Sequence, residues 1–227
     1  MTAPHSVFFD LDGTLLDTAQ DLHAALNRLC EEESRPLTKY ADFRCLVSQG
    51  SPAMLRLGFD CEPSAPDYER LRNRLLTLYA QDICTFTTPF PGVDQLITVL
   101  EGNAIQWGIV TNKPAWLTDK LLLKLGFAAN AVCVISGDTL ARRKPEPDQL
   151  LHACDLARCV PDRSVYVGDA KTDITAGRSA GMCTVAAAFG YIPAHENPAQ
   201  WQADLVIDAP LQLLDWLAIP TCDGASG

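Results

Sequence analysis

Four short polar segments of the sequence each follow an apolar segment, and their side chains could serve one reaction. The segments are Asp10-Leu11-Asp12-Gly13-Thr14, Thr111-Asn112-Lys113, Arg142-Arg143-Lys144-Pro145-Glu146-Pro147 and Gly168-Asp169-Ala170-Lys171-Thr172-Asp173. Brought together, they would gather four carboxylates, which repel one another unless a cation lies between them. Ligands that are all oxygen atoms are typical of a hard ion, and Mg²⁺ is the usual one. The sequence therefore predicts a Mg²⁺ site.

The first segment offers two carboxylates at the spacing that a strand places on one side. Residues i and i+2 of a strand face the same way, so Asp10 and Asp12 can reach one reaction centre. One carboxylate can attack as a nucleophile while the other transfers a proton. Thr111, Asn112 and Lys144 offer the hydroxyl, amide and ammonium donors that a transferring phosphoryl group needs. Together these residue types predict phosphoryl transfer.

Each segment taken alone also has an explanation without catalysis. Thr111-Asn112 is typical of a turn, and Lys144 lies in a charged run that could simply be solvated. Asp169 and Asp173 could cap the helix that follows them. The order of all four segments along the chain, rather than any one of them, favours a common site.

The segments must be positioned by the elements that precede them. Short apolar runs that end in turn residues predict strands, and amphipathic stretches between them predict helices. The expected strands are Val7–Leu11, Ile105–Val110, Ala131–Ile135, Ser164–Val167, Cys183–Ala187 and Leu205–Ile207. The expected helices between them are Val93–Leu100, Pro114–Leu125, Pro147–Ala157, Thr172–Ala180 and Leu211–Leu217. This alternation predicts an α/β fold, a Rossmann-like doubly wound parallel sheet that binds its ligand at the carboxyl ends of the strands.

Residues 17–86 break the alternation, because four helical stretches follow one another there. They are Thr18–Glu33, Tyr40–Val47, Ala53–Phe59 and Asp67–Cys84. The first strand needs partners from the later part of the chain, so this block must be inserted directly after it. We therefore expect a core formed by residues 1–16 and 87–227 and a small helical cap domain formed by residues 17–86.

Composition excludes several classes of partner. The 227 residues hold 18 Lys and Arg against 28 Asp and Glu, a formal net charge of −10. This charge argues against nucleic-acid binding and against docking on anionic membranes. We expect the partner to be a small phosphorylated metabolite and the protein to be a monomer or homodimer.

The cysteines and the apolar runs bear on the cellular compartment. Nine cysteines without a Cys-x-x-Cys pair indicate reduced thiols rather than a disulfide framework. The first residues lack a basic stretch, and no apolar run approaches about 18 residues. These features predict a cytoplasmic protein without a signal peptide or a transmembrane helix.

The four segments, in this order, resemble the motifs of the haloacid-dehalogenase-like phosphatases, and the resemblance spans the chain, cap included. It implies a Mg²⁺-dependent phosphatase in which Asp10 is phosphorylated and Asp12 acts as general acid and then base. It further implies that Thr111 and Lys144 hold the phosphate. Mg²⁺ would bind the carboxylates of Asp10 and Asp169 and the main-chain oxygen of Asp12, with Gly13, Thr14 and Asp173 in support.

Within that family the sequence looks like the phosphoglycolate-phosphatase-type branch. The segment that begins Gly190-Tyr191-Ile192 and continues through Trp201 is similar to bacterial phosphatases of N-acetylmuramic acid 6-phosphate, and so is Val47-Ser48-Gln49-Gly50. A surface loop and a helix cap would explain the same residues. The resemblance implies N-acetylmuramic acid 6-phosphate as the substrate, with phosphoglycolate as the alternative. In the cap, Arg44, Ser48, Gln49 and Arg56 are the polar candidates for contact with the leaving group.

Two other classes compete with a phosphatase. A phospho-accepting signalling domain has a similar sheet, but the second carboxylate of Asp12 and the inserted cap argue against it. A dehalogenase of the same superfamily would need neither a second Asp nor a metal, so Asp10-Leu11-Asp12-Gly13-Thr14 disfavours it. Hydrolysis of a phosphomonoester remains the favoured activity.

Overall fold

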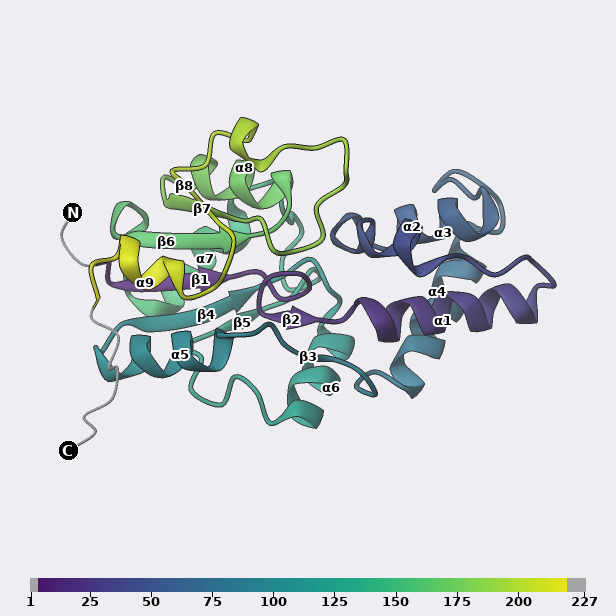
Figure 1. The fold of residues 1–227 in the computed structure, drawn as a ribbon, viewed down its shortest axis with the longest axis horizontal. Coiled ribbons are helices and arrows are strands. Elements are labelled where there is room, and N and C mark those ends of the chain that lie inside the picture. Colours follow the sequence, from purple (N-terminus) through teal and green to yellow (C-terminus); the bar gives the residue numbers. More distant parts are fainter. Residues whose placement is uncertain (1–3, 220–227) are drawn as a thin grey trace.

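A six-stranded, fully parallel sheet forms the centre of the larger part of the molecule (Figure 1). The structure, a computed structural model, describes residues 4–219. The strands lie in the order β5-β4-β1-β6-β7-β8. Their bounds are β1 Ser6–Phe9, β4 Gln106–Val110, β5 Val134–Ile135, β6 Ser164–Gly168, β7 Cys183–Ala187 and β8 Leu205–Ile207. The predicted doubly wound α/β fold is confirmed.

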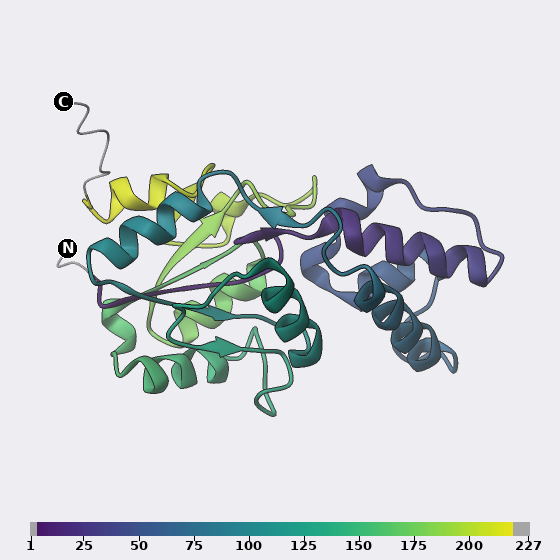
Figure 2. The ribbon, with the colours of Figure 1, turned by 90° about the horizontal axis from the view of Figure 1, so that it is seen from below.

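Helices cover both faces of the sheet because the side chains of β1 alternate between two apolar clusters. Val7 and Phe9 pack with helices α5 (Val93–Gly102), α6 (Ala115–Leu125) and α9 (Gln212–Trp216). Phe8 packs on the other face with α7 (Asp148–Ala157) and α8 (Lys171–Ser179). Figure 2 shows α5 and α9 on one side of the sheet and α7 on the other. A strand buried on both faces is the expected environment for a short, wholly apolar run.

The remaining helices form a separate unit beyond the carboxyl ends of the strands (Figures 1 and 2). They are α1 (Ala19–Glu32), α2 (Tyr40–Arg44), a 3₁₀ turn (Val47–Gln49), α3 (Ser51–Phe59) and α4 (Tyr68–Gln81). Leu26 and Leu29 of α1 are fully buried with Leu75 and Leu78 of α4, so the amphipathic faces of the two long helices pack against each other.

A short antiparallel pair of strands joins this helical unit to the sheet. Leu16–Asp17 (β2) pairs with Thr88–Pro89 (β3), where the chain leaves the sheet and returns to it. The buried carboxylate of Asp21 accepts hydrogen bonds from the amides of Thr85, Phe86 and Thr87. Sequence reasoning missed this pair, since two-residue strands carry no periodic signal.

Some expected elements are shorter in the structure, for local reasons. β1 ends at Phe9 rather than Leu11, because the carbonyl of Leu11 turns to accept the amide of Leu16 at 2.9 Å. The expected strand Ala131–Ile135 contributes only Val134–Ile135, at the edge of the sheet. The expected helix Tyr40–Val47 ends at Arg44. In the described part of the chain, no helix combines the length and apolar character needed to cross a membrane.

Candidate active site

Three of the predicted site residues directly follow three adjacent strands. Asp10 follows β1, Thr111 follows β4 and Asp169 follows β6, and all three are buried. The register pairs Phe9 with both Ile109 and Val167, which aligns the ends of the three strands. The sheet alone therefore brings together residues that lie more than 150 positions apart in the chain.

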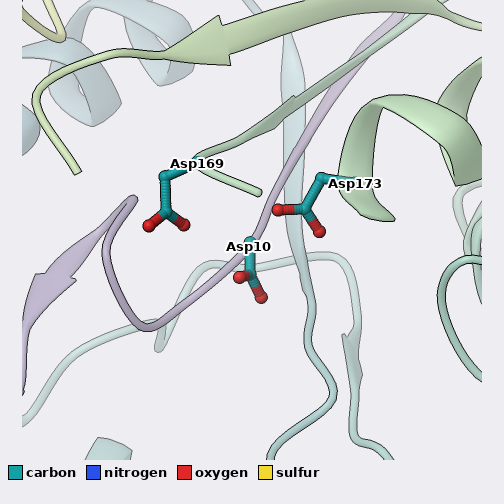
Figure 3. Close-up of side chains that lie close together, drawn as sticks. All are labelled: Asp10, Asp169 and Asp173. Carbon is teal, nitrogen blue, oxygen red and sulfur yellow. The ribbon is translucent and has the colours of Figure 1, made fainter. Parts of the chain in front are cut away.

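Asp10, Asp169 and Asp173 form a cluster whose nearest carboxylate oxygens all lie within 4.8 Å of one another. Figure 3 shows Asp10 between the other two, which come from the end of β6 and from α8. Burial raises the pKa of Asp10 to about 6 against the opposing effect of Lys144. Burial, followed by the charges of Asp10 and Asp173, raises the pKa of Asp169 to about 7. Such crowding is costly without a cation.

Lys144 is the one ammonium in contact with this cluster among residues 4–219. Its Nζ lies 2.9 Å from Oδ1 of Asp10 and 2.7 Å from Oδ1 of Asp173. It also donates to the hydroxyl of Tyr166 at 2.7 Å. If all three carboxylates ionise, this ammonium compensates only one of their three negative charges. Within the described residues, Lys144 is the one cation that contacts Oδ1 of Asp10, and this oxygen is buried.

The helical unit reaches Asp169 directly. The hydroxyl of Ser48 donates to Oδ2 of Asp169 at 2.6 Å, and the amide of Tyr191 donates to the same oxygen at 2.9 Å. Thr14 donates to Oδ1 at 3.2 Å. One buried carboxylate thus joins the loop after β1, the loop after β7 and the 3₁₀ turn at Val47–Gln49.

Gly13 is required by its surroundings. Its φ is +89°, and a Cβ atom there would lie 2.1 Å from Oδ2 of Asp169. Any other residue would be strained and would collide with this carboxylate. The glycine that sequence analysis placed in a supporting role thus allows the loop after β1 to approach Asp169.

Asp12 lies outside the carboxylate cluster and has a cation of its own. Nζ of Lys113 donates to Oδ1 of Asp12 at 2.8 Å, and the hydroxyl of Thr18 donates to the same oxygen at 2.6 Å. Nζ of Lys113 also donates to the hydroxyl of Tyr79 on α4 at 3.0 Å. Burial opposes the charged form of Lys113, but Asp12 and Tyr79 outweigh it and raise its pKa.

Asn112 connects two of the predicted segments. Its side-chain amide donates to the carbonyl of Lys144 at 3.0 Å, which ties the loop after β4 to the loop that carries the lysine. The hydroxyl of Thr111 accepts the amide of Lys113 at 3.2 Å. Asn112 therefore contacts the backbone of Lys144, while Lys144 itself contacts Asp10.

A cavity of about 190 Å³ lies between the sheet and the helical unit. Of the predicted residues, Asp10, Asp12, Ser48, Gln49, Thr111 and Asn112 line it. Its walls also include the following largely apolar or aromatic residues: Leu22, Val47, Met54, Tyr68, Leu76, Tyr79 and Leu117. Asp10, Asp12 and several residues of the helical unit thus line one common cavity.

Two residues named as candidates for contact with the leaving group do not line this cavity. Arg44 donates to the carbonyl of Gly190 at 3.0 Å, and its guanidinium lies 4.9 Å from the centre of the Tyr191 ring. Arg56 pairs with Glu62 on the surface. The first connects the helical unit to the loop after β7, and the second is solvated.

Sequence reasoning missed several residues at this cavity. Lys113 and Arg143 line the cavity, although the sequence assigned a role only to their neighbours Asn112 and Lys144. Tyr68, Arg72 and Tyr79 of α4 line the cavity as well. Their helical spacing in the sequence could have placed them on one face, but only the fold shows which face meets the aspartates.

The fold and the motif residues place the chain in a known class of enzymes. The family model described as haloacid dehalogenase-like hydrolase matches residues 7–187. The chain belongs to this family.

Within this family the chain is similar to phosphatases of two kinds. The chain is 36% identical over 218 residues to the N-acetylmuramic acid 6-phosphate phosphatase of Pseudomonas aeruginosa, covering 96% of each protein. It is 42% identical over 220 residues to the phosphoglycolate phosphatase of Xanthomonas campestris pv. campestris, covering 97% of this chain and 99% of the relative. A crystal structure of a predicted phosphoglycolate phosphatase from Haemophilus somnus superposes with a TM-score of 0.85 at 23% identity, over 95% of this chain and 99% of that one.

Proposed function

We propose that the protein is a phosphatase that hydrolyses a small phosphomonoester through a phosphorylated Asp10. One observation carries this proposal: the buried Asp10 carboxylate contacts Lys144 at 2.9 Å and lines the same cavity as Asp12. A carboxylate beside an ammonium can attack phosphorus in its ionised form, which the ammonium favours.

Asp12 is assigned the proton transfers. It protonates the leaving oxygen in the first step and takes a proton from the attacking water in the second. Its Oδ1 accepts from Lys113 and Thr18, which fix the direction of the carboxylate. Thr111 and Lys144 are assigned to the phosphate, and Asn112 holds the loop of Lys144 in place.

The donor set fits a divalent cation. Three buried carboxylates that share a single ammonium suit a 2+ ion, and an all-oxygen set favours Mg²⁺. Asp10 and Asp169 would hold it with the main-chain oxygen of Asp12. Asp173 contacts Nζ of Lys144 at 2.7 Å, so it is assigned to position this lysine. When bound, the ion would neutralise charge on the phosphoryl group.

Residues 17–86 are assigned as a cap that closes over the substrate. Its contacts with the core include Ser48 with Asp169, Arg44 with Gly190 and Tyr79 with Lys113. Closure of such a unit excludes water and surrounds the leaving group.

The cap wall favours a leaving group larger than two carbons. Tyr68, Met54, Leu76 and Tyr79 present apolar and aromatic surface to the cavity, which a sugar with acetyl and lactyl groups could cover. N-acetylmuramic acid 6-phosphate, the substrate named for the relative from Pseudomonas aeruginosa, is therefore the proposed substrate. Phosphoglycolate is the second candidate, because the relative at 42% identity is named for it.

A side-by-side measurement of both substrates with Mg²⁺ tests this assignment. We expect kcat/KM for N-acetylmuramic acid 6-phosphate to exceed that for phosphoglycolate by at least about 10-fold, corresponding to about 1.4 kcal/mol of transition-state binding. The reverse preference would assign the protein to the second substrate. Turnover of neither substrate would contradict both assignments.

Removing Lys113 is expected to slow the chemical step. In Lys113→Met, Asp12 keeps only Thr18 as a donor, and breaking a buried ion pair costs about 3–5 kcal/mol. Since Asp12 protonates the leaving group, kcat for an alkyl phosphate should fall more than kcat for p-nitrophenyl phosphate. Steady-state kinetics and thermal unfolding measure the two effects.

The matched control is Lys120→Met, which removes an exposed lysine of α6. It should leave both substrates at the rate of the unsubstituted enzyme. Equal losses on the alkyl and nitrophenyl esters in Lys113→Met would mean that this lysine supports the fold but does not position Asp12.

A further inference from the structure

Helix α4 directs one of its arginines toward the cavity and two away from it. Tyr68, Arg72, Leu76 and Tyr79 recur every three or four residues and line the cavity together. Arg70 and Arg74 lie on another face, where they pair with Glu33 and Glu32 of the helical unit. Arg72 is thus the charged member of a stripe that is otherwise aromatic or apolar.

Arg143 faces the same cavity from the core. It precedes Lys144, and its neighbour Arg142 pairs with Asp148 at 2.7 Å. Within residues 4–219, no carboxylate forms an ion pair with Arg143. Arg72 has one ion pair, at 3.7 Å, with the largely exposed Glu69.

These two arginines differ from the third cation that lines the cavity. Lys113 is neutralised by Asp12 at 2.8 Å, whereas neither arginine has a short contact with a carboxylate. Arg72 and Arg143 also both line the neighbouring cavity, which shares Leu76, Asn112 and Pro114 with the first. Arg72 and Arg143 therefore lie at the boundary between the two cavities.

We propose that Arg72 and Arg143 bind a carboxylate on the leaving group, so that the enzyme selects phosphomonoesters that carry a second acidic group. Guanidinium groups suit this role because their planar donors match a carboxylate in pairs. The inference rests on the proposed function and adds the class of substrate. N-acetylmuramic acid and glycolate differ greatly in size, but both carry a carboxylate that such a site could bind.

The test compares acidic substrates with matched neutral ones. N-acetylmuramic acid 6-phosphate is paired with N-acetylglucosamine 6-phosphate, which lacks the lactyl carboxylate, and phosphoglycolate is paired with 2-hydroxyethyl phosphate. In Arg72→Met and Arg143→Met we expect kcat/KM for the acidic member to fall about 10- to 100-fold, mainly through KM, as for loss of a charged hydrogen bond. The neutral member should change less than about 2-fold.

Matched controls come from the same two segments. Arg74→Met removes an arginine of α4 that pairs with Glu32, and Arg142→Met removes the residue next to Arg143. Both should keep the selectivity of the unsubstituted enzyme. Turnover of p-nitrophenyl phosphate shows that each variant is folded, and inhibition by N-acetylmuramic acid or glycolate, but not by inorganic phosphate, should weaken in Arg72→Met and Arg143→Met.

The outcomes separate this inference from the proposed function. Equal losses on the acidic and neutral substrates in the two variants, or no loss on either, would refute the carboxylate site. The proposal that the unsubstituted enzyme is a phosphatase would still stand. If the unsubstituted enzyme with Mg²⁺ hydrolyses none of these phosphomonoesters, the proposed function fails and the inference fails with it.

Discussion

Asp10→Asn is expected to eliminate turnover and to yield no phosphorylated enzyme. The amide that replaces the carboxylate is not a nucleophile, so the first chemical step has no attacking group. The substitution keeps the shape of the side chain beside Lys144. Loss of activity with an unchanged unfolding temperature would therefore reflect chemistry and not packing.

Asp12→Asn should behave differently, because it keeps the nucleophile and loses the proton donor. Removal of one acid–base group is expected to cost about 10²–10⁴-fold in rate. With p-nitrophenyl phosphate, whose leaving group needs no acid, phosphorylation of Asp10 should persist while hydrolysis of the intermediate slows. Intact-mass spectrometry after a rapid acid quench should detect a phosphate adduct in Asp12→Asn.

The two variants control for each other. A phosphate adduct in Asp10→Asn would place the nucleophile elsewhere in the chain. Unchanged turnover in Asp12→Asn would show that the proton transfers do not depend on this carboxylate. Either outcome would overturn the division of roles between the two aspartates.

Removal of divalent ions is the second change expected to abolish activity. Asp10, Asp169 and Asp173 form one cluster in which, among residues 4–219, only Asp10 and Asp173 contact an ammonium, and the remaining negative charge would repel an incoming phosphate dianion. Excess EDTA should therefore stop turnover, and added Mg²⁺ should restore it. Ca²⁺ should inhibit, because its larger and looser coordination shell fits in-line transfer poorly.

Asp169→Asn should shift the metal requirement without disturbing the fold. The donors from Ser48 and Tyr191 can still reach an amide oxygen at this position, while one negative charge is lost. We expect the Mg²⁺ concentration for half-maximal activity to rise by at least about 10-fold, in line with changes around other metal sites. Calorimetric titration with Mg²⁺ should show the same weakening in the absence of substrate.

Asp155→Asn serves as the matched control, since Asp155 is exposed on α7 away from the cluster. It should bind Mg²⁺ as the unsubstituted protein does. Full activity in excess EDTA would contradict a metal requirement, and an unchanged Mg²⁺ requirement in Asp169→Asn would contradict Asp169 as a ligand.

Much of the site could be predicted from the sequence because parallel strands bring their carboxyl ends to one edge. Once the apolar runs around Val7 and Val165 are assigned as neighbouring strands, Asp10 and Asp169 must meet. The family motifs add Thr111 and Lys144 by position alone. These inferences need only the strand order and the location of each residue directly after its strand.

The pairing of Asp12 with Lys113, by contrast, was decided by tertiary structure. Lys113 directly follows Thr111 and Asn112, which received roles, yet its partner Asp12 is 101 positions away. Its second contact, Tyr79, comes from the helical unit. The turn at Gly13 separates Asp12 from the carboxylates around Asp10. Simple alternation along a strand could not show that separation.

The helical unit shows most clearly what only the fold could decide. Its amphipathic helices were readable from periodicity, since apolar residues at helical spacing need a common core. Periodicity does not say which polar residues turn toward the sheet, because that depends on how the whole unit docks. In the docked unit the hydroxyl of Ser48 donates to Asp169, the guanidinium of Arg44 contacts the Tyr191 ring, and Arg72 lines the cavity. The sequence by itself determined which polar residues follow the strands, while the packing of one unit against the other decided which residues of the helical unit line the cavity with Asp10 and Asp12.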